Sequence, residues 1–283
     1  MATDPNLWKE LVCGIGLGLI VIVCAVRIYI EARPDYLVAV EVRPSNIKLL
    51  LYRVAVLAFF VVVWIIRINS SNWFNLNYYT YWNFTLQIVY LSAVIVYQAR
   101  HWANIQVNAA RGLNILHDVM LSSCFLVTLV FWILLFDPKK PPSDFATYIV
   151  HLANLVLLLI EFAANEFVVQ RSSLKYLVLW PTLYSILTWI GNVTYLDGFW
   201  PYDLMDLNKS LAPVIWFGII LAHVVCFCIA LLLSKLKRHW SLPAAPLMPP
   251  ELMETTATGA MSSVHIQIVT PPATATSFDG SKV

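Results

Sequence analysis

A stripe of polar side chains lies within one apolar run of the chain. His151, Asn154, Glu161 and Asn165 belong to the mostly apolar segment Phe145–Val169. At about 100° per residue, Asn154, Glu161 and Asn165 share one helical face, with His151 near its edge. An imidazole can exchange protons near neutral pH. In a bilayer, an imidazole or a carboxylate costs about 3 kcal/mol unless it faces a protein interior or a wet cavity, so His151 is a candidate functional residue.

A second polar stripe opens another apolar segment. Thr80, Asn83 and Gln87 follow i, i+3 and i+7 spacing, which places them on one helical face. At about 1.5 Å per residue, Thr80 lies about 6 Å from the start of its segment, and His151 lies about 9 Å from the start of its segment. The two side chains are therefore expected at similar depth. Such residues also hold membrane helices together by hydrogen bonds, and packing is the alternative role for both stripes.

The elements that must position these residues are expected to be membrane-spanning helices. Hydrophobic residues make up 60% of the 283 positions and charged residues only 12%. The apolar blocks predict an all-α, polytopic transmembrane helix bundle of about seven spans, each able to cross about 30 Å of hydrocarbon. The predicted spans are Leu11–Ile30, Leu49–Ile66, Leu76–Gln98, Leu113–Phe136, Phe145–Val169, Leu174–Leu196 and Pro213–Ser234. The first is interpreted as a retained anchor, because no clean cleavage site follows it.

The chain divides by composition into three parts. Residues 1–48 are expected to form the anchor span and a first cytoplasmic loop, and residues 49–240 a six-span core. Residues 241–283 are rich in Pro, Thr, Ala and Ser and are predicted to be a disordered cytoplasmic tail. The tail ends Ser281-Lys282-Val283, a pattern that PDZ domains bind, so a PDZ protein is an expected partner and an inert end the alternative.

Charge asymmetry predicts the orientation. Alternate joints place eleven basic residues on one side, namely Arg27, Arg33, Arg43, Lys48, Arg100, Arg111, Arg171, Lys175, Lys235, Lys237 and Arg238. The other side carries five, namely Lys9, Arg67, Lys139, Lys140 and Lys209. The N-terminus is therefore expected outside or in a lumen and the C-terminus in the cytoplasm, in the plasma membrane or the endoplasmic reticulum. Sequons at Asn69 and Asn208 fall on the predicted outer side.

Several function classes fit the sequence poorly. The net charge is only +2, so nucleic acid is not an expected partner. Cys226 and Cys228 lie about 200° apart around a helix and cannot both bind one metal, and no metal or other cofactor is predicted. A seven-span receptor is a weaker alternative, because the third span ends Tyr97-Gln98-Ala99-Arg100 and the seventh lacks both Asn and Tyr. No repeat symmetry of the kind seen in transporters is visible.

Four short motifs resemble one superfamily of membrane proteins. They are Thr80-Tyr81-Trp82-Asn83, His151-Leu152-Ala153-Asn154, Leu157-Leu158-Leu159-Ile160-Glu161 and Trp200-Pro201-Tyr202-Asp203-Leu204-Met205-Asp206. Their order and spacing look like those of the androgen-induced protein family and the related rolling stone family. The resemblance covers roughly residues 49–240 and leaves the first span and the tail outside.

The resemblance implies a hydrolase of fatty acid esters of hydroxy fatty acids. By resemblance, Thr80 and His151 form the catalytic pair. The chemistry is coherent, since an imidazole can take the threonine proton during attack on an ester and return it to the leaving alkoxide. Asn83, Asn154 and Gln87 are expected to support the site, with the Asn83 or Asn154 amide near the oxyanion.

Two further expectations accompany this reading. Glu161 is expected to make an interhelical contact, with His223 or His117, because it lies about 15 Å along the helix from His151 at about 1.5 Å per residue. The asparagine three residues after His151 is more similar to the rolling stone branch, whose members are linked to cell fusion. A non-catalytic membrane protein in adhesion or fusion is therefore the alternative function.

Overall fold

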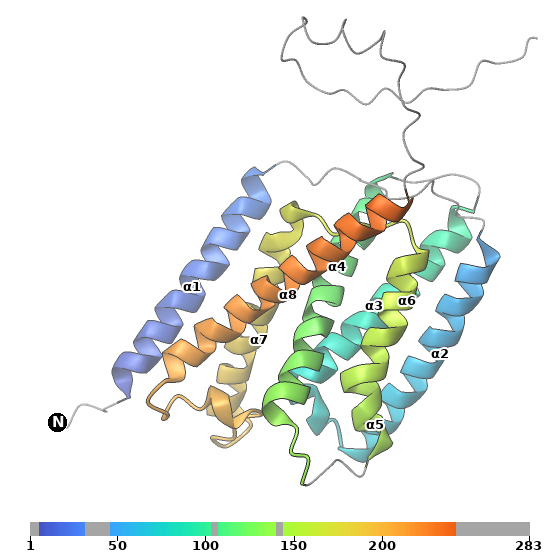
Figure 1. The fold of residues 1–283 in the computed structure, drawn as a ribbon. Helices are drawn as coiled ribbons and strands as arrows, with labels where there is room; N and C mark the ends of the chain where they lie inside the picture. Colours follow the sequence, from blue (N-terminus) through green and yellow to red (C-terminus); the bar gives the residue numbers. More distant parts are fainter. Residues whose placement is uncertain (1–5, 32–45, 103–106, 140–143, 242–283) are drawn as a thin grey trace, which may run out of the picture. The chain divides into compact units, whose positions relative to one another are not determined.

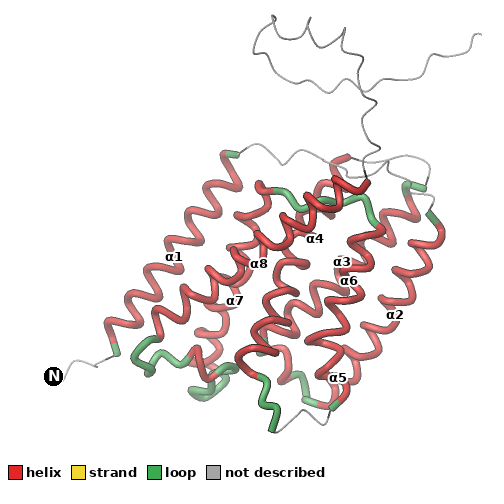
Figure 2. Tube along the Cα trace, in the orientation of Figure 1, coloured by secondary structure: helices red, strands yellow, loops and turns green. Residues whose placement is uncertain are grey.

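The computed structural model describes residues 6–31, 46–102, 107–139 and 144–241. Regular elements in these ranges are helical (Figures 1 and 2), which confirms the all-α class. The main helices are α1 (Leu7–Ile30), α2 (Ile47–Ser70), α3 (Tyr79–Arg100), α4 (Val107–Val130), α5 (Phe145–Tyr148), α6 (Asn154–Ala164), α7 (Leu174–Thr194) and α8 (Ala212–Ser241). Shorter turns are η1 (Phe74–Asn77), η2 (Phe131–Leu135), η3 (Ile149–Ala153), η4 (Arg171–Ser173) and η5 (Asp203–Met205).

Five helical stretches are long and apolar enough to cross a membrane. They are Leu7–Ile30, Ile47–Ser70, Ala110–Leu135, Phe145–Ala164 and Ala212–Trp240. The other two long helices, α3 and α7, contain 22 and 21 residues. They are less apolar, because Thr, Tyr, Trp, Asn and Gln side chains replace aliphatic ones along much of their length.

The helices lie side by side within the unit Met1–Leu242 (Figure 1). Helix α4 is the most enclosed of the five apolar helices, and it packs against α3, α6, α7 and α8. Helix α1 packs along α7 and leaves most of its apolar side chains exposed. In a membrane-spanning bundle such exposed aliphatic faces would contact lipid, and small and polar residues would gather between helices.

The segment expected as one span from Phe145 to Val169 is instead interrupted twice. A π-helical turn, η3, separates α5 from α6, and α6 ends at Ala164. Asn165 leaves the helix in an extended conformation (φ −84°, ψ 173°). The Lys237 ammonium then donates to the carbonyl oxygens of Phe162 (2.5 Å) and Phe167 (2.8 Å), which satisfies acceptors that a helix end leaves open.

A second π-helical turn, η2, follows α4 directly. The two turns meet, since the ring of Phe131 in η2 stacks on the His151 ring of η3 with centroids 3.8 Å apart and planes 10° apart. A π turn holds one more residue than an α turn and often occurs at functional sites. The wide turns thus lie where the sequence predicts chemistry.

Some of the sequence-based predictions concern regions that the structure does not describe. The predicted tail from Leu242 onward, its end Ser281-Lys282-Val283 and most of the predicted first loop (32–45) lie outside the described residues.

Candidate functional site

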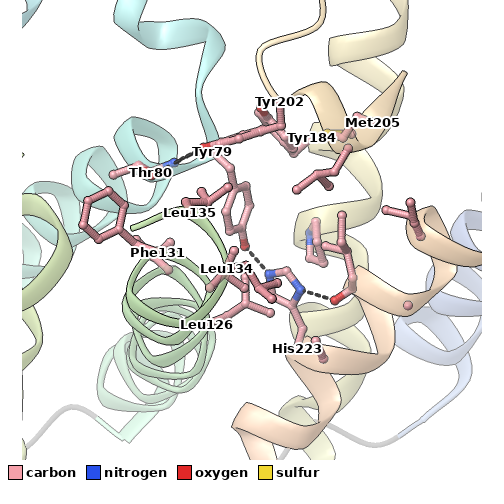
Figure 3. Close-up of a pocket in the computed structure, with 18 of the residues that line it drawn as sticks. Tyr79, Thr80, Leu126, Phe131, Leu134, Leu135, Tyr184, Tyr202, Met205 and His223 are labelled. Atoms are coloured by element: carbon pink, nitrogen blue, oxygen red, sulfur yellow. Dashed lines mark hydrogen bonds between the residues drawn. The ribbon is translucent and has the colours of Figure 1, made fainter. Parts of the chain in front are cut away.

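Thr80 lies in the first turn of α3, which begins after the extended residue Tyr78. Its side chain is largely buried, with 7% of its surface exposed. Thr80 Oγ1 lies 3.4 Å from Tyr202 Oη, and the same phenol oxygen lies 3.4 Å from the Thr80 backbone nitrogen (Figure 3). Tyr202 comes from the loop between α7 and α8. The Thr80 hydroxyl therefore has a phenol as its close polar neighbour.

His151 lies in the π turn η3 with its ring held between helices. One face stacks on Phe131, and its backbone carbonyl accepts a hydrogen bond from Trp132 Nε1 at 3.1 Å. The Nδ1 atom is buried and has no hydrogen-bond partner among the described residues. A buried ring nitrogen without a partner is costly unless a ligand or water satisfies it.

One apolar cavity of about 400 Å³ is lined by both Thr80 and His151. The other lining residues are Tyr79, Leu126, Val127, Val130, Phe131, Leu134, Leu135, Pro181, Tyr184, Ser185, Tyr202, Leu204, Met205, Ile215, Gly218, Ile219, Ala222 and His223. They come from α3, α4, α7, α8, both π turns and the α7–α8 loop (Figure 3). Among the described residues that line the cavity, none is aspartate, glutamate, lysine or arginine. The volume falls in the range of about 300–1,000 Å³ common for small-molecule sites.

Tyr79 and His223 form a hydrogen-bonded pair in the wall of the cavity (Figure 3). His223 Nδ1 lies 2.8 Å from the Ile219 carbonyl oxygen, which can only accept, so Nδ1 carries the proton of the neutral ring. Nε2 then accepts from the Tyr79 hydroxyl at 2.7 Å, and Tyr79 Oη also lies 3.1 Å from Ser123 Oγ. The sequence analysis named His223 as one of two alternative partners of Glu161. In the structure His223 pairs with Tyr79 instead.

Tyr202 is the functional candidate without a role in the sequence analysis. It belongs to the motif Trp200–Asp206, which marked this loop as part of the resemblance. The sequence of a loop does not show which side chain its tyrosine contacts. Burial raises the pKa of Tyr202 above its ordinary value, so the phenol stays protonated and can donate a hydrogen bond.

The three expected supporting residues do not line the cavity. Asn83 and Gln87 are fully buried beside Cys124, whose Sγ accepts from Gln87 Nε2 at 3.6 Å. The Asn154 side chain accepts from the Leu155 backbone nitrogen at 2.8 Å. The side-chain nitrogen and oxygen of Asn83 have no hydrogen-bond partner among the described residues, and none of the three residues lines the space between Thr80 and His151.

A buried cluster of charges lies at the opposite end of α3. Arg53 donates to Glu161 Oε1 from Nε (3.0 Å) and Nη2 (2.7 Å), and to Gln98 Oε1 from Nη1 (2.8 Å). The same carboxylate accepts from the Tyr90 hydroxyl (3.0 Å) and from Asn165 Nδ2 (2.6 Å). Glu161 thus makes the expected interhelical contact, chiefly with an arginine that the sequence analysis did not single out.

Asp118 on α4 anchors a neighbouring group of polar residues. Its carboxylate accepts from Asn114 Nδ2 (2.8 Å), Ser173 Oγ (2.6 Å) and the Gln170 backbone nitrogen (3.1 Å). His117 lies between the two carboxylates, with ring nitrogens 3.8 Å from Asp118 and 4.0 Å from Glu161, which are too long for hydrogen bonds.

The residues described hold no group of three or more His, Cys, Asp or Glu side chains able to bind a metal ion. The five cysteines are free. Comparison of the chain with models of known protein families, with curated proteins and with solved structures finds no match.

Proposed function

We propose that this chain is a membrane-embedded hydrolase of long-chain lipid esters, related to the androgen-induced and rolling stone proteins. Its substrates are fatty acid esters of hydroxy fatty acids. The observation that carries the proposal is that Thr80 and His151, from segments far apart in the sequence, line one apolar cavity. A cavity whose described lining has no charged side chain suits the ester group and the long aliphatic chains of such a lipid, while the carboxylate of its hydroxy fatty acid part stays outside the cavity.

In the proposed reaction, Thr80 is the nucleophile and His151 the general base. Thr80 Oγ1 attacks the ester carbonyl while His151 takes its proton, and the tetrahedral intermediate expels the alkoxide, which takes that proton back. The product is an acyl-threonine and an alcohol. Water then attacks the acyl-threonine with His151 again as base, and release of the fatty acid restores the Thr80 hydroxyl. The net reaction is ester plus water to acid plus alcohol.

Tyr202 supplies the electrostatic part of this mechanism. Its phenol lies within 3.4 Å of both the nucleophilic oxygen and the Thr80 backbone nitrogen. When Thr80 Oγ1 attacks the ester, the oxyanion that forms would lie beside two donors, the Tyr202 hydroxyl and the Thr80 backbone N–H. It would also lie at the N-terminus of α3, where the helix dipole favours negative charge. The two donors replace the Asn83 and Asn154 amides in the expected oxyanion role.

Thr80 and His151 are not hydrogen-bonded to each other in the described structure, and Thr80 contacts Tyr202 instead. Catalytic hydrogen bonds are often long without substrate and shorten in the Michaelis complex. The proposal therefore places the substrate ester between the Thr80 wall and the His151 wall.

We also propose seven spans, with the N-terminus outside or lumenal and the C-terminus cytoplasmic, in the plasma membrane or the endoplasmic reticulum. Helices α3 and α7 are long enough to cross about 30 Å at about 1.5 Å per residue, and they pack beside the five apolar stretches. The asymmetry of basic residues between the joints supports this orientation.

The test is hydrolysis by the purified protein in lipid nanodiscs, together with covalent labelling by a serine and threonine hydrolase probe. We expect Thr80→Ala and His151→Ala to abolish both signals and Thr80→Ser to retain labelling. Ser185→Ala is the matched control, since Ser185 is another buried hydroxyl residue lining the same cavity. Full activity of Thr80→Ala, or loss of activity only in Ser185→Ala, would contradict the assignment.

The second candidate is a non-catalytic membrane protein in adhesion or fusion. The observation in its favour is the stacking of His151 on Phe131, which is a packing contact between the turns η2 and η3. Under this alternative the parent protein neither hydrolyses the ester nor accepts the probe.

A further inference from the structure

The cavity reaches the surface of the bundle between the turn η2 and helix α8. Two of its lining residues in η2, Leu134 and Leu135, are 69% and 44% exposed. On α8 the lining residue Gly218 is exposed as well. Residues that both line a cavity and reach the surface mark its opening. Leu134 and Leu135, labelled in Figure 3, therefore lie on one side of that opening and Gly218 on the other.

The opening lies in the part of the chain that is apolar enough for the membrane interior. Leu134 and Leu135 belong to the apolar stretch Ala110–Leu135, and Gly218 belongs to Ala212–Trp240. Gly218 follows the start of α8 by six residues, or about 9 Å at about 1.5 Å per residue. In a membrane-spanning bundle, an opening at this depth would face lipid chains rather than water.

Open space lies beside Gly218 at the opening. A Cβ atom added at Gly218 would meet no atom within 4 Å. Glycine is a poor helix former compared with alanine, so α8 gains no helical stability from this residue. The space beside Gly218 at the cavity opening is thus free for the Cβ of a larger side chain, which would narrow the opening.

We propose that the opening at Gly218 is a lateral entrance through which the acyl chain of a lipid ester enters the cavity from the bilayer, ester end inward. The absence of charged side chains from the described lining gives a free carboxylate no counter-ion, so the ester is favoured over the free fatty acid. The placement of the ester group beside Thr80 and His151 rests on the proposed function. Binding of the acyl chain in the cavity does not depend on that function.

The experiment uses the full chain in nanodiscs with an uncharged photoreactive probe, the methyl ester of a hydroxy fatty acid whose hydroxyl carries a long acyl chain with a diazirine. We expect cross-links to peptides from η2 and the first half of α8. Gly218→Trp should lower this labelling by about tenfold or more, because a pocket discriminates strongly against lost space. Gly218→Ala should change it little.

Gly18→Trp is the matched control. Gly18 also lies in an apolar helix with no atom within 4 Å of an added Cβ, but it does not line the cavity. We expect it to leave labelling unchanged. A free fatty acid probe with the same diazirine should label less than the ester, and equal labelling would overturn the assignment to an ester. Unchanged cross-linking in folded Gly218→Trp would overturn the entrance.

The two proposals fail in different ways. Thr80→Ala removes the nucleophile and should retain the photolabelling of η2 and α8. If hydrolysis survives in Thr80→Ala while Gly218→Trp still blocks labelling, the entrance stands and the catalytic pair is wrong. If Gly218→Trp hydrolyses long-chain and short-chain esters as the parent does, the catalytic proposal stands and the entrance is wrong.

Discussion

The two ends of α3 border buried polar regions, and the Thr80 and His151 side chains at one end are less completely bonded than the Arg53–Glu161 pair at the other. At the start of α3, Thr80 has one long contact to Tyr202, and His151 Nδ1 has no partner among the described residues. At its end, Glu161 accepts four hydrogen bonds, two of them from Arg53. His117, beside the charged pair, also has ring nitrogens without a hydrogen-bond partner among the described residues. A fully bonded buried pair holds helices together, whereas a cavity lined by partly bonded groups is ready for a ligand. We therefore assign structure to the charged end and chemistry to the apolar end.

The largest expected effect is on activity at the apolar end. Thr80→Ala and His151→Ala should each lower the hydrolysis rate by about 1,000-fold or more, and the double variant should lose no more than either single variant. Thermal unfolding of Thr80→Ala in detergent should change by less than about 1 kcal/mol, because its hydroxyl completes no bonded network. His151→Ala also loses the stack on Phe131 and should cost about 2 kcal/mol, less than the loss in transition-state stabilisation. A loss of stability matching the loss of activity would erase the distinction between the two ends.

Arg53→Ala should show the reverse pattern. The substitution leaves Glu161 as a buried, uncompensated carboxylate, which costs about 3–5 kcal/mol. We expect a lower thermal midpoint in detergent, or failure to accumulate as folded protein. The double variant Arg53→Leu, Glu161→Leu removes both charges and should recover part of that stability. If Arg53→Ala unfolds at the temperature of the parent, the charged end is not a structural anchor.

Tyr202→Phe tests the electrostatic part of the apolar end. Removing one oxyanion donor typically lowers the rate by about 100-fold, and we expect a loss of that size in kcat with little change in KM. Tyr184→Phe is the matched control. Tyr184 also lines the cavity, but its hydroxyl donates to the Asn77 carbonyl at 2.8 Å and is not free for substrate. Equal losses in the two variants would point to packing as the role of both tyrosines.

The smallest expected effect is at a partly exposed ion pair, Glu31 with Lys175. Glu31 lies after the end of α1, and hydrogen bonds from Lys175 and Arg27 hold its pKa below the ordinary value of 4.5. The folded protein therefore binds this proton less tightly than the unfolded chain. The stabilisation is complete above pH 4.5 and is lost as the pH falls through the lowered pKa.

Thermal midpoints measured across this acidic range check the prediction for Glu31. Solvent screens a partly exposed pair, so the drop should be small beside the effect of Arg53→Ala. Glu31→Gln should remove this part of the pH dependence. An unchanged pH profile in Glu31→Gln would show that the pair adds nothing measurable to stability.

The sequence predicts the helical class and the positions of the apolar helices well, because a long apolar block leaves the backbone few ways to satisfy its polar groups in a membrane. It also places Thr80 and His151 at similar depth, and both line the cavity. Their catalytic roles remain predictions. Periodicity counts residues at 100° each, so it predicts neither the π turns nor the early end of α6 at Ala164.

The partners of the buried charges were harder to predict. A cation near the end of a span can reach the membrane surface or turn inward, and sequence alone does not distinguish these two positions for Arg53. Sequence alone also does not show that His223 on α8 pairs with Tyr79 on α3. Such pairs depend on which helices become neighbours, and this information is not local.

The paired π turns have a consequence for how this chain can change length. Inserting or deleting a residue in an α-helix rotates everything beyond it by about 100° and would ordinarily misplace a whole helix face. In η2 and η3 an additional residue is already accommodated within a single turn. Deleting one residue from η3 would convert it to an ordinary turn and re-aim His151 while the rest of α6 keeps its neighbours. Insertions and deletions at these two turns are thus the mutational route by which relatives could acquire or lose the histidine in the cavity without rebuilding the bundle.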